Sequence, residues 1–380
     1  IFHLLVSILI AGSLASAQWS RFPSTNTPVC RSTGDQRSPK AVPYPDGGMI
    51  VVWTDQRNGN YDIYAQRLDG GGNPLWAQDG ISVCSAPGDQ QYPTIARDAS
   101  GGVFIAWADG RSGASFIYAQ RLTGAGVPLW GDGGEIISGN PTSEILPQAI
   151  SDNSGGAVFI WENASSQWDL AAQHVDSNGT RLWTPINGVT IQSLTDSRNA
   201  SITLDGAGGI ILAWQDWRNG SNWDIYAQRI SLANGGVTWT AGGVPLCRAS
   251  KDQMLPKLVR DGSTGVIVTW QDDRNGTVSE ARNDIYAQRV QNDGTPMWAS
   301  DGQAVCSANR DQSRPSILED GAGGAFLAWQ DARNSLASPP TYDIYAQRIN
   351  SGGSKMWDTN GVAISIDPFG QDQLLPRVVG

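Results

Sequence analysis

Residues 101–111 read GGVFIAWADGR, and related stretches recur five more times along the 380-residue chain. The tryptophans at their centres follow one another at intervals of 54, 54, 53, 56 and 59 residues: Trp53, Trp107, Trp161, Trp214, Trp270 and Trp329. A glycine stands five residues before each of them. Self-similarity at a nearly fixed period identifies a repeat architecture. Six copies of one structural unit therefore determine the fold.

Each unit contains four short apolar or alternating runs, which predict β-strands. In the second unit these runs are residues 81–85, 94–98, 103–107 and 117–122. The third run, VFIAW, is apolar at every position, as expected of a strand that is covered on both faces. Four-stranded sheets that stack face to face are the blades of a propeller. We therefore predict an all-β fold, a β-propeller of four-stranded antiparallel blades.

Other repeat architectures fit the pattern less well. No unit shows the 3.6-residue periodicity of a helical solenoid, and the coils of a parallel β-helix are much shorter than these units. A string of separate domains is disfavoured because one four-stranded sheet cannot bury both of its faces alone. After the sixth unit the pattern restarts at residues 362–365 and 376–379. This predicts six complete repeats followed by a truncated seventh.

The start of the chain resembles an export signal. An apolar stretch, Leu4–Ala11, leads to Ala15-Ser16-Ala17, the small-x-small pattern that a signal peptidase cuts. We expect a signal peptide at residues 1–17, truncated at its N-terminus because it has no initiator methionine and no basic segment. The propeller domain would then span residues 18–380 and be incomplete at its C-terminus. A secreted, periplasmic or cell-surface location follows, without membrane insertion after cleavage.

The composition disfavours one class of partner. The 45 glycines and 16% charged residues suit many short strands joined by tight turns. The net charge of −10 and the isoelectric point near 4.7 provide no basic field that could hold a phosphate backbone. We therefore predict that the protein does not bind nucleic acid.

One unit carries the motifs of a known repeat. They are Pro315-Ser316-Ile317, Asp320-Gly321, Ala328-Trp329-Gln330-Asp331-Ala332-Arg333-Asn334 and Asp343-Ile344-Tyr345. This segment resembles the repeat of TolB-like propellers, a WD40-like (PD40-type) repeat found in secreted bacterial repeat proteins. The likeness extends over all six units, although these units are longer and place Asp where that family usually has Ser before x-Arg. The resemblance implies the propeller fold and nothing more about this chain.

Two charged positions recur around the central tryptophan. An aspartate lies 18 residues before it and an arginine four residues after it, and the third unit has serine at both positions, Ser143 and Ser165. The joint loss suggests that the two side chains pair within each blade as a structural staple, since an arginine fork can hold a carboxylate bidentately. The predicted pairs are Asp35–Arg57, Asp89–Arg111, Asp196–Arg218, Asp252–Arg274 and Asp311–Arg333.

The repeated hairpin aspartates could bind metal ions, and the repeated cysteines could form disulfides. A ring of hairpin aspartates could bind Ca²⁺, but the adjacent arginine argues against a cation, so we predict no metal and no cofactor. These aspartates are Asp55, Asp109, Asp216, Asp272 and Asp331. The four cysteines share one repeat position in different blades, and we expect free thiols. They are Cys30, Cys84, Cys247 and Cys306.

The sequence contains no recognisable catalytic set. After signal cleavage one histidine remains, His174, so neither a Ser-His-Asp triad nor a His-based zinc site can form. A glycosidase would need two carboxylates outside the repeat pattern, and Glu144, Glu162 and Glu280 meet that description, although surface exposure is the simpler interpretation. Aromatic residues near the hairpins could stack on sugars or pack between blades. They are Tyr61, Trp168, Trp223 and Tyr342.

The units differ from one another mainly in one hairpin. Units five and six carry insertions there, which form a candidate partner-binding surface or reflect neutral loop growth. Its candidate residues are Glu280, Arg282, Pro339, Pro340 and Tyr342. We predict a secreted, non-catalytic binding or scaffold module for a protein or glycan partner. The alternative is a glycan-cleaving propeller of the sialidase or glycoside hydrolase type.

Overall fold

The computed structural model describes residues 27–139, 143–164, 168–192, 195–277, 282–335, 340–366, 372–374 and 376–378. The predicted signal peptide at residues 1–17 lies outside these residues. The described residues form β-strands and no helix. In this part of the chain, no helix is long and apolar enough to cross a membrane.

The strands form six antiparallel sheets of four, which we number in chain order. Sheets 1 to 3 contain β1 (Gln36–Pro43), β2 (Met49–Asp55), β3 (Asp62–Leu68) and β4 (Ile81–Cys84); β5 (Gln90–Arg97), β6 (Val103–Asp109), β7 (Phe116–Leu122) and β8 (Glu135–Ile136); β9 (Ser143–Ser151), β10 (Ala157–Ala164), β11 (Trp168–Val175) and β12 (Val189–Gln192). Sheets 4 to 6 contain β13 (Ser197–Leu204), β14 (Gly209–Asp216), β15 (Asp224–Ser231) and β16 (Val244–Cys247); β17 (Gln253–Arg260), β18 (Val266–Asp272), β19 (Asp284–Val290) and β20 (Gln303–Cys306); β21 (Gln312–Glu319), β22 (Ala325–Asp331), β23 (Asp343–Ile349) and β24 (Val362–Ser365).

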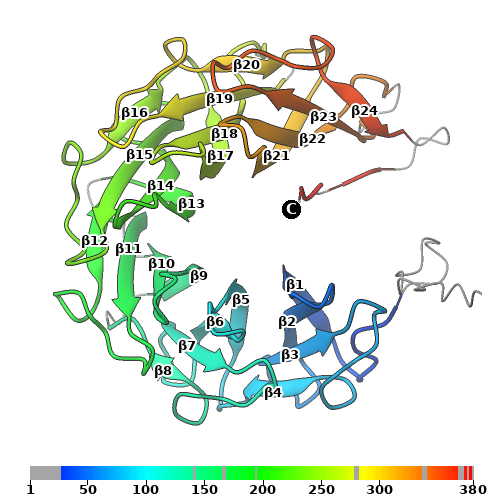
Figure 1. Cartoon of the computed structure of the whole chain (residues 1–380), viewed down its shortest axis with the longest axis vertical. Coiled ribbons are helices and arrows are strands. Elements are labelled where there is room, and N and C mark those ends of the chain that lie inside the picture. Colours follow the sequence, from blue (N-terminus) through cyan, green and yellow to red (C-terminus); the bar gives the residue numbers. More distant parts are fainter. Residues whose placement is uncertain are drawn as a thin grey trace, which may run out of the picture.

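The sheets follow one another around a ring axis (Figure 1). The first strand of each sheet is innermost and the fourth is outermost, which is the arrangement of propeller blades. The predicted β-propeller of four-stranded antiparallel blades is confirmed. Sheets 2 to 5 are apolar on both faces because each packs between two neighbours. For example, Phe104 and Trp130 of sheet 2 share a core cluster with Phe159 and Trp161 of sheet 3.

The predicted grouping of strands into blades was wrong by one strand. Residues 81–85 were expected to open the second blade, but β4 pairs with β3 and completes sheet 1. Residues 362–365 likewise form the outer strand of sheet 6, and residues 376–378 form no strand. Each sheet therefore joins three strands of one repeat to the first strand of the next. The connection after each outer strand crosses to the inner edge of the following sheet.

A buried glutamine in the third strand organises the turn that follows it. In sheet 5, Gln288 Nε2 donates to the carbonyl of Ala299 at 2.8 Å, and Gln288 Oε1 accepts the backbone N–H of Trp298 at 2.8 Å. Because both ends of the amide are bonded, the side chain can be fully buried. The same position is occupied by Gln66, Gln120, Gln173, Gln228, Gln288 and Gln347.

The turn glycine that precedes each outer strand lies against the central tryptophan of its own sheet. Gly302 has a φ of +90°, and a Cβ there would come within 2.5 Å of Trp270 Cη2 and 3.1 Å of the Ala287 carbonyl. Gly59, at a hairpin tip, also has a positive φ of +100°, but a Cβ at that position would meet no atom within 4 Å. Only the first glycine is required for packing as well as for backbone conformation.

Replacing Gly302 by alanine should therefore destabilise the protein more than replacing Gly59. Both substitutions strain a positive φ, whereas G302A also forces Cβ into the Trp270 ring. Overpacking of this kind costs about 1–3 kcal/mol. Urea denaturation followed by tryptophan fluorescence should show G302A losing about that much more unfolding free energy than G59A. Equal losses would contradict the packing role of Gly302.

Candidate functional site

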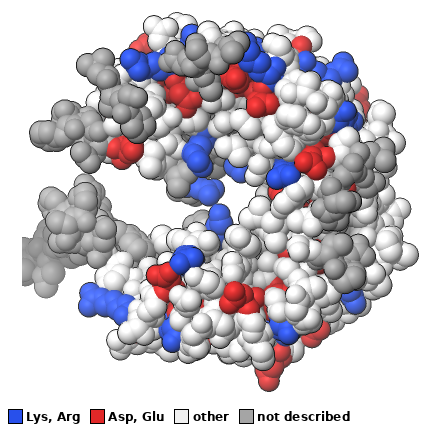
Figure 2. All heavy atoms as spheres, turned by 180° about the vertical axis from the view of Figure 1, so that it is seen from behind, with Lys and Arg blue, Asp and Glu red and all other residues white. Residues whose placement is uncertain are grey.

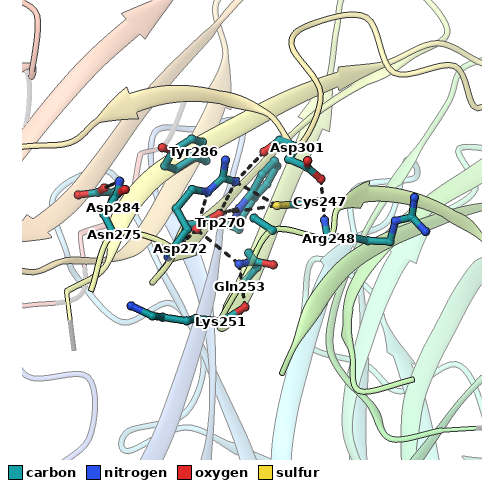
Figure 3. Close-up of polar contacts among 12 residues, drawn as sticks. Cys247, Arg248, Lys251, Gln253, Trp270, Asp272, Asn275, Asp284, Tyr286 and Asp301 are labelled. Atoms are coloured by element: carbon teal, nitrogen blue, oxygen red, sulfur yellow. Dashed lines mark hydrogen bonds and ion pairs between the residues drawn. The ribbon is translucent and has the colours of Figure 1, made fainter. Parts of the chain in front are cut away.

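A buried cluster of polar side chains recurs at the hairpin end of the sheets, and Figure 3 shows it in sheet 5. Asp272, fully buried at the end of β18, accepts the Trp270 Nε1–H at 2.8 Å. Arg274 Nε and Nη2 donate to the two carboxylate oxygens of Asp272 at 2.8 and 2.6 Å. The guanidinium carbon of Arg274 lies 3.8 Å from the ring centroid of Tyr286. The buried carboxylate is thus compensated by a bidentate ion pair.

The predicted aspartate–arginine pairing is corrected by this cluster. Each arginine binds the aspartate two residues before it, not the one 22 residues before it. These pairs are Arg57–Asp55, Arg111–Asp109, Arg218–Asp216, Arg274–Asp272 and Arg333–Asp331. In the third sheet Asn163 replaces the aspartate and accepts the Trp161 Nε1–H at 3.0 Å. The carboxylate and the arginine are therefore lost together in that blade.

Four of the five more distant aspartates connect neighbouring blades instead. Asp252 accepts the backbone N–H of Trp223 at 3.0 Å, and Asp311 accepts that of Asn283 at 3.1 Å. Asp89 and Asp196 make the same contact to the preceding blade, and Asp35 pairs with Arg37. The physical reason is that the loop carrying each aspartate crosses between sheets. It therefore meets the hairpin of the preceding blade rather than its own.

The hairpin aspartates offer little to a metal ion. Both oxygens of Asp272 already accept N–H donors from Trp270 and Arg274. Among the described residues, no group of three or more His, Cys, Asp or Glu is placed to hold a metal. The four cysteines are free thiols, and Cys247 Sγ lies 3.0 Å from Arg274 Nη2. Cys84, Cys247 and Cys306 each end the outer strand of one sheet and contact the arginine of the next sheet.

The two described carboxylates that were candidates for catalysis do not form a pair. The register of β9 and β10 places Glu144 opposite Asn163 and Glu162 opposite Ile145, so the two glutamates point to opposite faces of sheet 3. Glu144 is fully buried and accepts the hydroxyl of Ser138. Glu280 lies outside the described residues. No two-carboxylate site of the glycosidase kind is formed by Glu144 and Glu162.

Glu162 nonetheless differs chemically from the residues at the same position in the following sheets. It accepts the backbone N–H of Asn199 in sheet 4 at 2.7 Å. Gln215 and Gln271 occupy the equivalent position and accept the corresponding N–H groups of the next sheets. Burial raises the pKa of Glu162, against the lowering effect of the Asn199 N–H. A carboxyl group that can hold a proton thus replaces a neutral amide here.

Beside Glu162, aromatic rings surround a partly exposed arginine. Arg198, on the innermost strand β13, lies 4.1 Å from the Trp168 ring centroid and 5.8 Å from that of Trp223. Trp217 contacts Trp223 edge-on with centroids 5.2 Å apart. All four side chains are half-buried. We call Trp168, Arg198, Trp217 and Trp223 the rim cluster; it joins two of the aromatic residues proposed above as sugar-stacking candidates.

Three cationic side chains converge at the ring axis. Lys40 on β1, Lys257 on β17 and Arg377 near the end of the described chain occupy the same repeat position on innermost segments. The charges of both Arg377 and Lys40 act on Lys257, although sheets 1 and 5 do not pack together. Figure 2 shows Lys and Arg side chains around the central opening. Among the described residues, none of the three has a carboxylate ion-pair partner. We call them the axial cations.

The pKa of Lys257 is lowered to about 8, chiefly by burial and also by the neighbouring charges of Arg377 and Lys40. The pKa of Lys40 is lowered by the same causes, burial first and Arg377 second. The sequence did carry a signal for this cluster. The equivalent position is uncharged in the other units, with Thr94, Gln148, Ser201 and Ser316. Aligning the units and seeking charges confined to some copies would have found it.

The inserted hairpins of sheets 5 and 6 remain a candidate partner-binding surface, with less structural support than the axial cations have. Glu280 and Pro339 lie outside the described residues, and Pro340 is exposed. Arg282 donates to the carbonyls of Ser307 and Ala308, and the Tyr342 hydroxyl donates to Asp311 at 3.1 Å. These contacts hold the two described polar side chains against the blade boundaries. A partner-binding role for this surface stays a prediction.

No protein-family model matches the chain, and no curated protein matches it. Several solved structures do match the chain. The chain is similar to a PL25 ulvan lyase bound to -[GlcA(1-4)Rha3S]-, with 12% identity and a TM-score of 0.55 over 84% of this chain and 81% of that one. It is also similar to the polysaccharide lyase Uly1, with 11% identity and a TM-score of 0.49 over 83% and 77%. At such low identity the likeness shows the propeller fold alone.

Thiol labelling should separate Cys30 from the other three cysteines. Burial raises the pKa of Cys84 to about 11 and that of Cys306 to about 12, so at pH 8 only about 0.1% or less of these thiols is ionised. Cys30 is only partly buried. Time-resolved alkylation read by peptide mass spectrometry should modify Cys30 first and the others only after unfolding. Rapid native labelling of Cys84, or fewer than four reactive thiols in denaturant, would contradict this.

Proposed function

We propose that this propeller binds an acidic polysaccharide at its ring axis, with carboxylate or sulfate groups held by the axial cations. The observation that carries the proposal is the convergence of Lys40, Lys257 and Arg377 without a described carboxylate partner, in a chain whose net charge is −10. Surplus cations at one place in an acidic protein form a local field that attracts an anion.

The electrostatics of the axis support an anionic ligand. Three like charges repel one another, and burial disfavours the charged form of Lys257. Both effects make the axial cations unfavourable for the isolated protein. An anion between them would reverse the sign of the interaction and provide charge-assisted hydrogen bonds. A polysaccharide supplies such anions at regular spacing along one flexible chain.

The rim cluster supplies the second kind of contact that a sugar needs. Tryptophan rings stack on the apolar faces of pyranoses while leaving their hydroxyl edges in water. Trp168 and Trp223 flank Arg198, which pairs with Asp196 at 3.2 Å, so apolar surface and polar hydrogen-bonding groups lie side by side. Arg198 and Lys257 belong to the innermost strands of adjacent sheets. A chain that reaches the axis from the hairpin end would pass this cluster.

Two further considerations support a glycan over a protein partner. The ulvan lyase that shares this fold is bound to an acidic, sulfated disaccharide unit, which is a fold-level analogy only. Extracellular polysaccharides are also accessible to a secreted protein, which is the location that the predicted signal peptide implies. A protein partner and the TolB-like relationship remain predictions from the sequence.

The second candidate function is cleavage of the same polysaccharide, and Glu162 is the observation that favours it. Its carboxyl has a raised pKa, lies in the boundary between sheets 3 and 4 and neighbours Arg198 of the rim cluster. A carboxyl group with a raised pKa holds its proton to higher pH and can donate it to a leaving glycosidic oxygen. Glutamine at this position in sheets 4, 5 and 6 shows that the architecture does not require the acid.

Replacing Lys257 by serine should weaken binding of an acidic polysaccharide. Serine occupies this position in units four and six, so the fold should tolerate K257S. Loss of one charged contact corresponds to about 1.5–3 kcal/mol, or a roughly tenfold or larger rise in Kd. Titration calorimetry with alginate or a sulfated polysaccharide measures it. Affinity for wild type should also fall as pH rises through about 8, because Lys257 loses its proton, and K257S should show less of this dependence.

The matched control is Lys355→Ser, which makes the same charge change in the turn after β23, away from the axis. It should leave the Kd within about twofold of wild type. A neutral glucan should not bind measurably through the axial cations. If K257S and K355S weaken binding equally, or if no acidic polysaccharide binds, the proposal fails.

Replacing Glu162 by glutamine tests cleavage separately from binding. E162Q restores the residue found in three other sheets, so folding and binding should persist while product formation stops. Reducing-end assays detect hydrolysis, and ultraviolet absorbance of unsaturated ends detects elimination. Product release by E162Q at the wild-type rate would remove Glu162 from the reaction. Binding by wild type without any product would reject cleavage and leave the binding proposal standing.

A further inference from the structure

A small pocket lies at the boundary between sheets 1 and 2, near the hairpin that joins β2 and β3. Its volume is about 30 Å³. A single water occupies about 10–15 Å³ of such a cavity, so the pocket has room for roughly two water-sized groups. Tyr92, at its edge, is 42% exposed, so the pocket opens to solvent. The lining residues, all from sheets 1 and 2, are Arg37, Ser38, Thr54, Tyr61, Gln91 and Tyr92.

A buried threonine hydroxyl in this pocket lacks a hydrogen bond. Thr54 is 4% exposed, and its Oγ1 has no hydrogen-bond partner among the described residues. Gln215 and Gln271 occupy the same repeat position in sheets 4 and 5. Their side-chain oxygens each accept a backbone N–H from the next sheet, that of Leu255 and that of Arg314, at 3.2 Å. Threonine is shorter than glutamine and does not make this contact. A buried hydroxyl without a partner is costly, so a ligand that supplies one gains affinity.

The backbone of Tyr92 directs a hydrogen-bond donor toward the same place. Tyr92 has a φ of +54°, and Leu255, its counterpart in sheet 5, has a φ of +55°. Both residues lie in a bulge of the innermost strand, at the same step of the register. Because the two share this backbone conformation, the Tyr92 N–H points toward Thr54 as the Leu255 N–H points toward Gln215. The pocket therefore offers both a hydroxyl and an N–H to one ligand group.

The charges around the pocket favour an uncharged ligand group. Asp35 pairs with Arg37, so this guanidinium is already compensated. Asp89 accepts the Tyr61 N–H at 3.1 Å and the Gln91 amide N–H at 3.3 Å. The two carboxylates would repel an anion in the pocket. A hydroxyl group, in contrast, can both donate and accept hydrogen bonds without carrying a charge. The volume admits roughly two heavy atoms, which is the size of a sugar's hydroxymethyl group.

The pocket and one of the axial cations lie on the same face of sheet 1. In the pairing of β1 with β2, Arg37 is opposite Thr54 and Lys40 is opposite Val52. Paired residues share a face, and so do Val52 and Thr54, which are two positions apart on β2. Val52 packs with Ile105 of sheet 2 in one core cluster, so this face meets sheet 2. A sugar chain held at the axis by Lys40 can therefore extend along β1 to the pocket.

We propose that this pocket recognises the hydroxymethyl group of an uncharged pyranose in the acidic polysaccharide. The inference rests on the proposed function, because that pyranose belongs to the chain whose anionic groups bind the axial cations. The hydroxymethyl oxygen accepts the Tyr92 N–H and donates a hydrogen bond to Thr54 Oγ1, while the sugar ring packs against the exposed surface of Tyr92. The protein should thus prefer a polymer of alternating acidic and uncharged sugars to a polymer of uronic acids alone.

The substitution Thr54→Val tests the pocket with little change of shape. Hyaluronan alternates a uronic acid with an uncharged sugar that carries a hydroxymethyl group, whereas alginate contains uronic acids alone. In titration calorimetry, loss of the hydrogen bond should raise the Kd for hyaluronan about fivefold or more and leave the Kd for alginate within about twofold. The Tm should not fall, because the hydroxyl that T54V removes has no partner among the described residues.

The matched control is Thr190→Val, the same change at an exposed residue of β12, which should alter neither the Kd nor the Tm. A hyaluronan Kd that T54V leaves unchanged would mean that the pocket holds only water, and would overturn the proposal. K257S separates the two sites, since it should weaken binding of both polymers. If T54V weakens hyaluronan binding while K257S does not, the axial proposal fails and the pocket stands.

Two uncharged oligosaccharides test the pocket without the axial cations. Cellohexaose and xylohexaose share the same linkage and differ in the hydroxymethyl group, which xylose lacks. Saturation-transfer NMR should detect contact of cellohexaose with the wild-type protein, and a weaker signal with T54V or with xylohexaose. If neither hyaluronan nor cellohexaose contacts the protein, or if xylohexaose contacts it equally, the pocket does not recognise a hydroxymethyl group.

Discussion

A four-stranded sheet that is apolar on both faces requires a neighbour on each side, and the structure follows from that requirement. Stacking such sheets side by side forms a ring, and the ring places the innermost strands around one axis. The same requirement explains why Ile364 is exposed while its counterpart in sheet 5, Val305, is buried. The positions of the axial cations and of the rim cluster are therefore consequences of one packing constraint.

Packing alone leaves the sheets free to slide, and the buried polar cluster fixes their register. Asp272 cannot be buried without Arg274, and Arg274 also contacts Cys247 of the preceding sheet. Sheet 3 has lost both charges together, which avoids an unpaired buried ion. It also carries Glu162 in place of glutamine and His174 in place of arginine. The repeat pattern thus breaks at several positions of sheet 3, and one of them, Glu162, lies beside Arg198 of the rim cluster.

The fold was predictable because its signal is periodic and local, whereas the sites depend on contacts that the sequence does not order. A repeat has no marked beginning, so the pattern around Trp107 could not show that residues 81–84 belong to the preceding sheet. The joint loss at Ser143 and Ser165 suggested a pair, but Asn163 changed in the same unit, and one event cannot select between two partners. Lys40 and Lys257 meet only because the ring closes most of a circle between them.

The axial cations depend on a segment that lies beyond the last strand. Arg377 belongs to this segment, and its charge acts on both Lys40 and Lys257. Sheet 6 holds the segment, because the Gln373 N–H donates to the Tyr342 carbonyl and the Val378 N–H donates to the Ser316 hydroxyl. A change that strengthens these contacts would restrict Arg377 to the axis and strengthen the attraction for an anion. By linkage, an anion bound at the axis would stabilise the held segment by the same free energy.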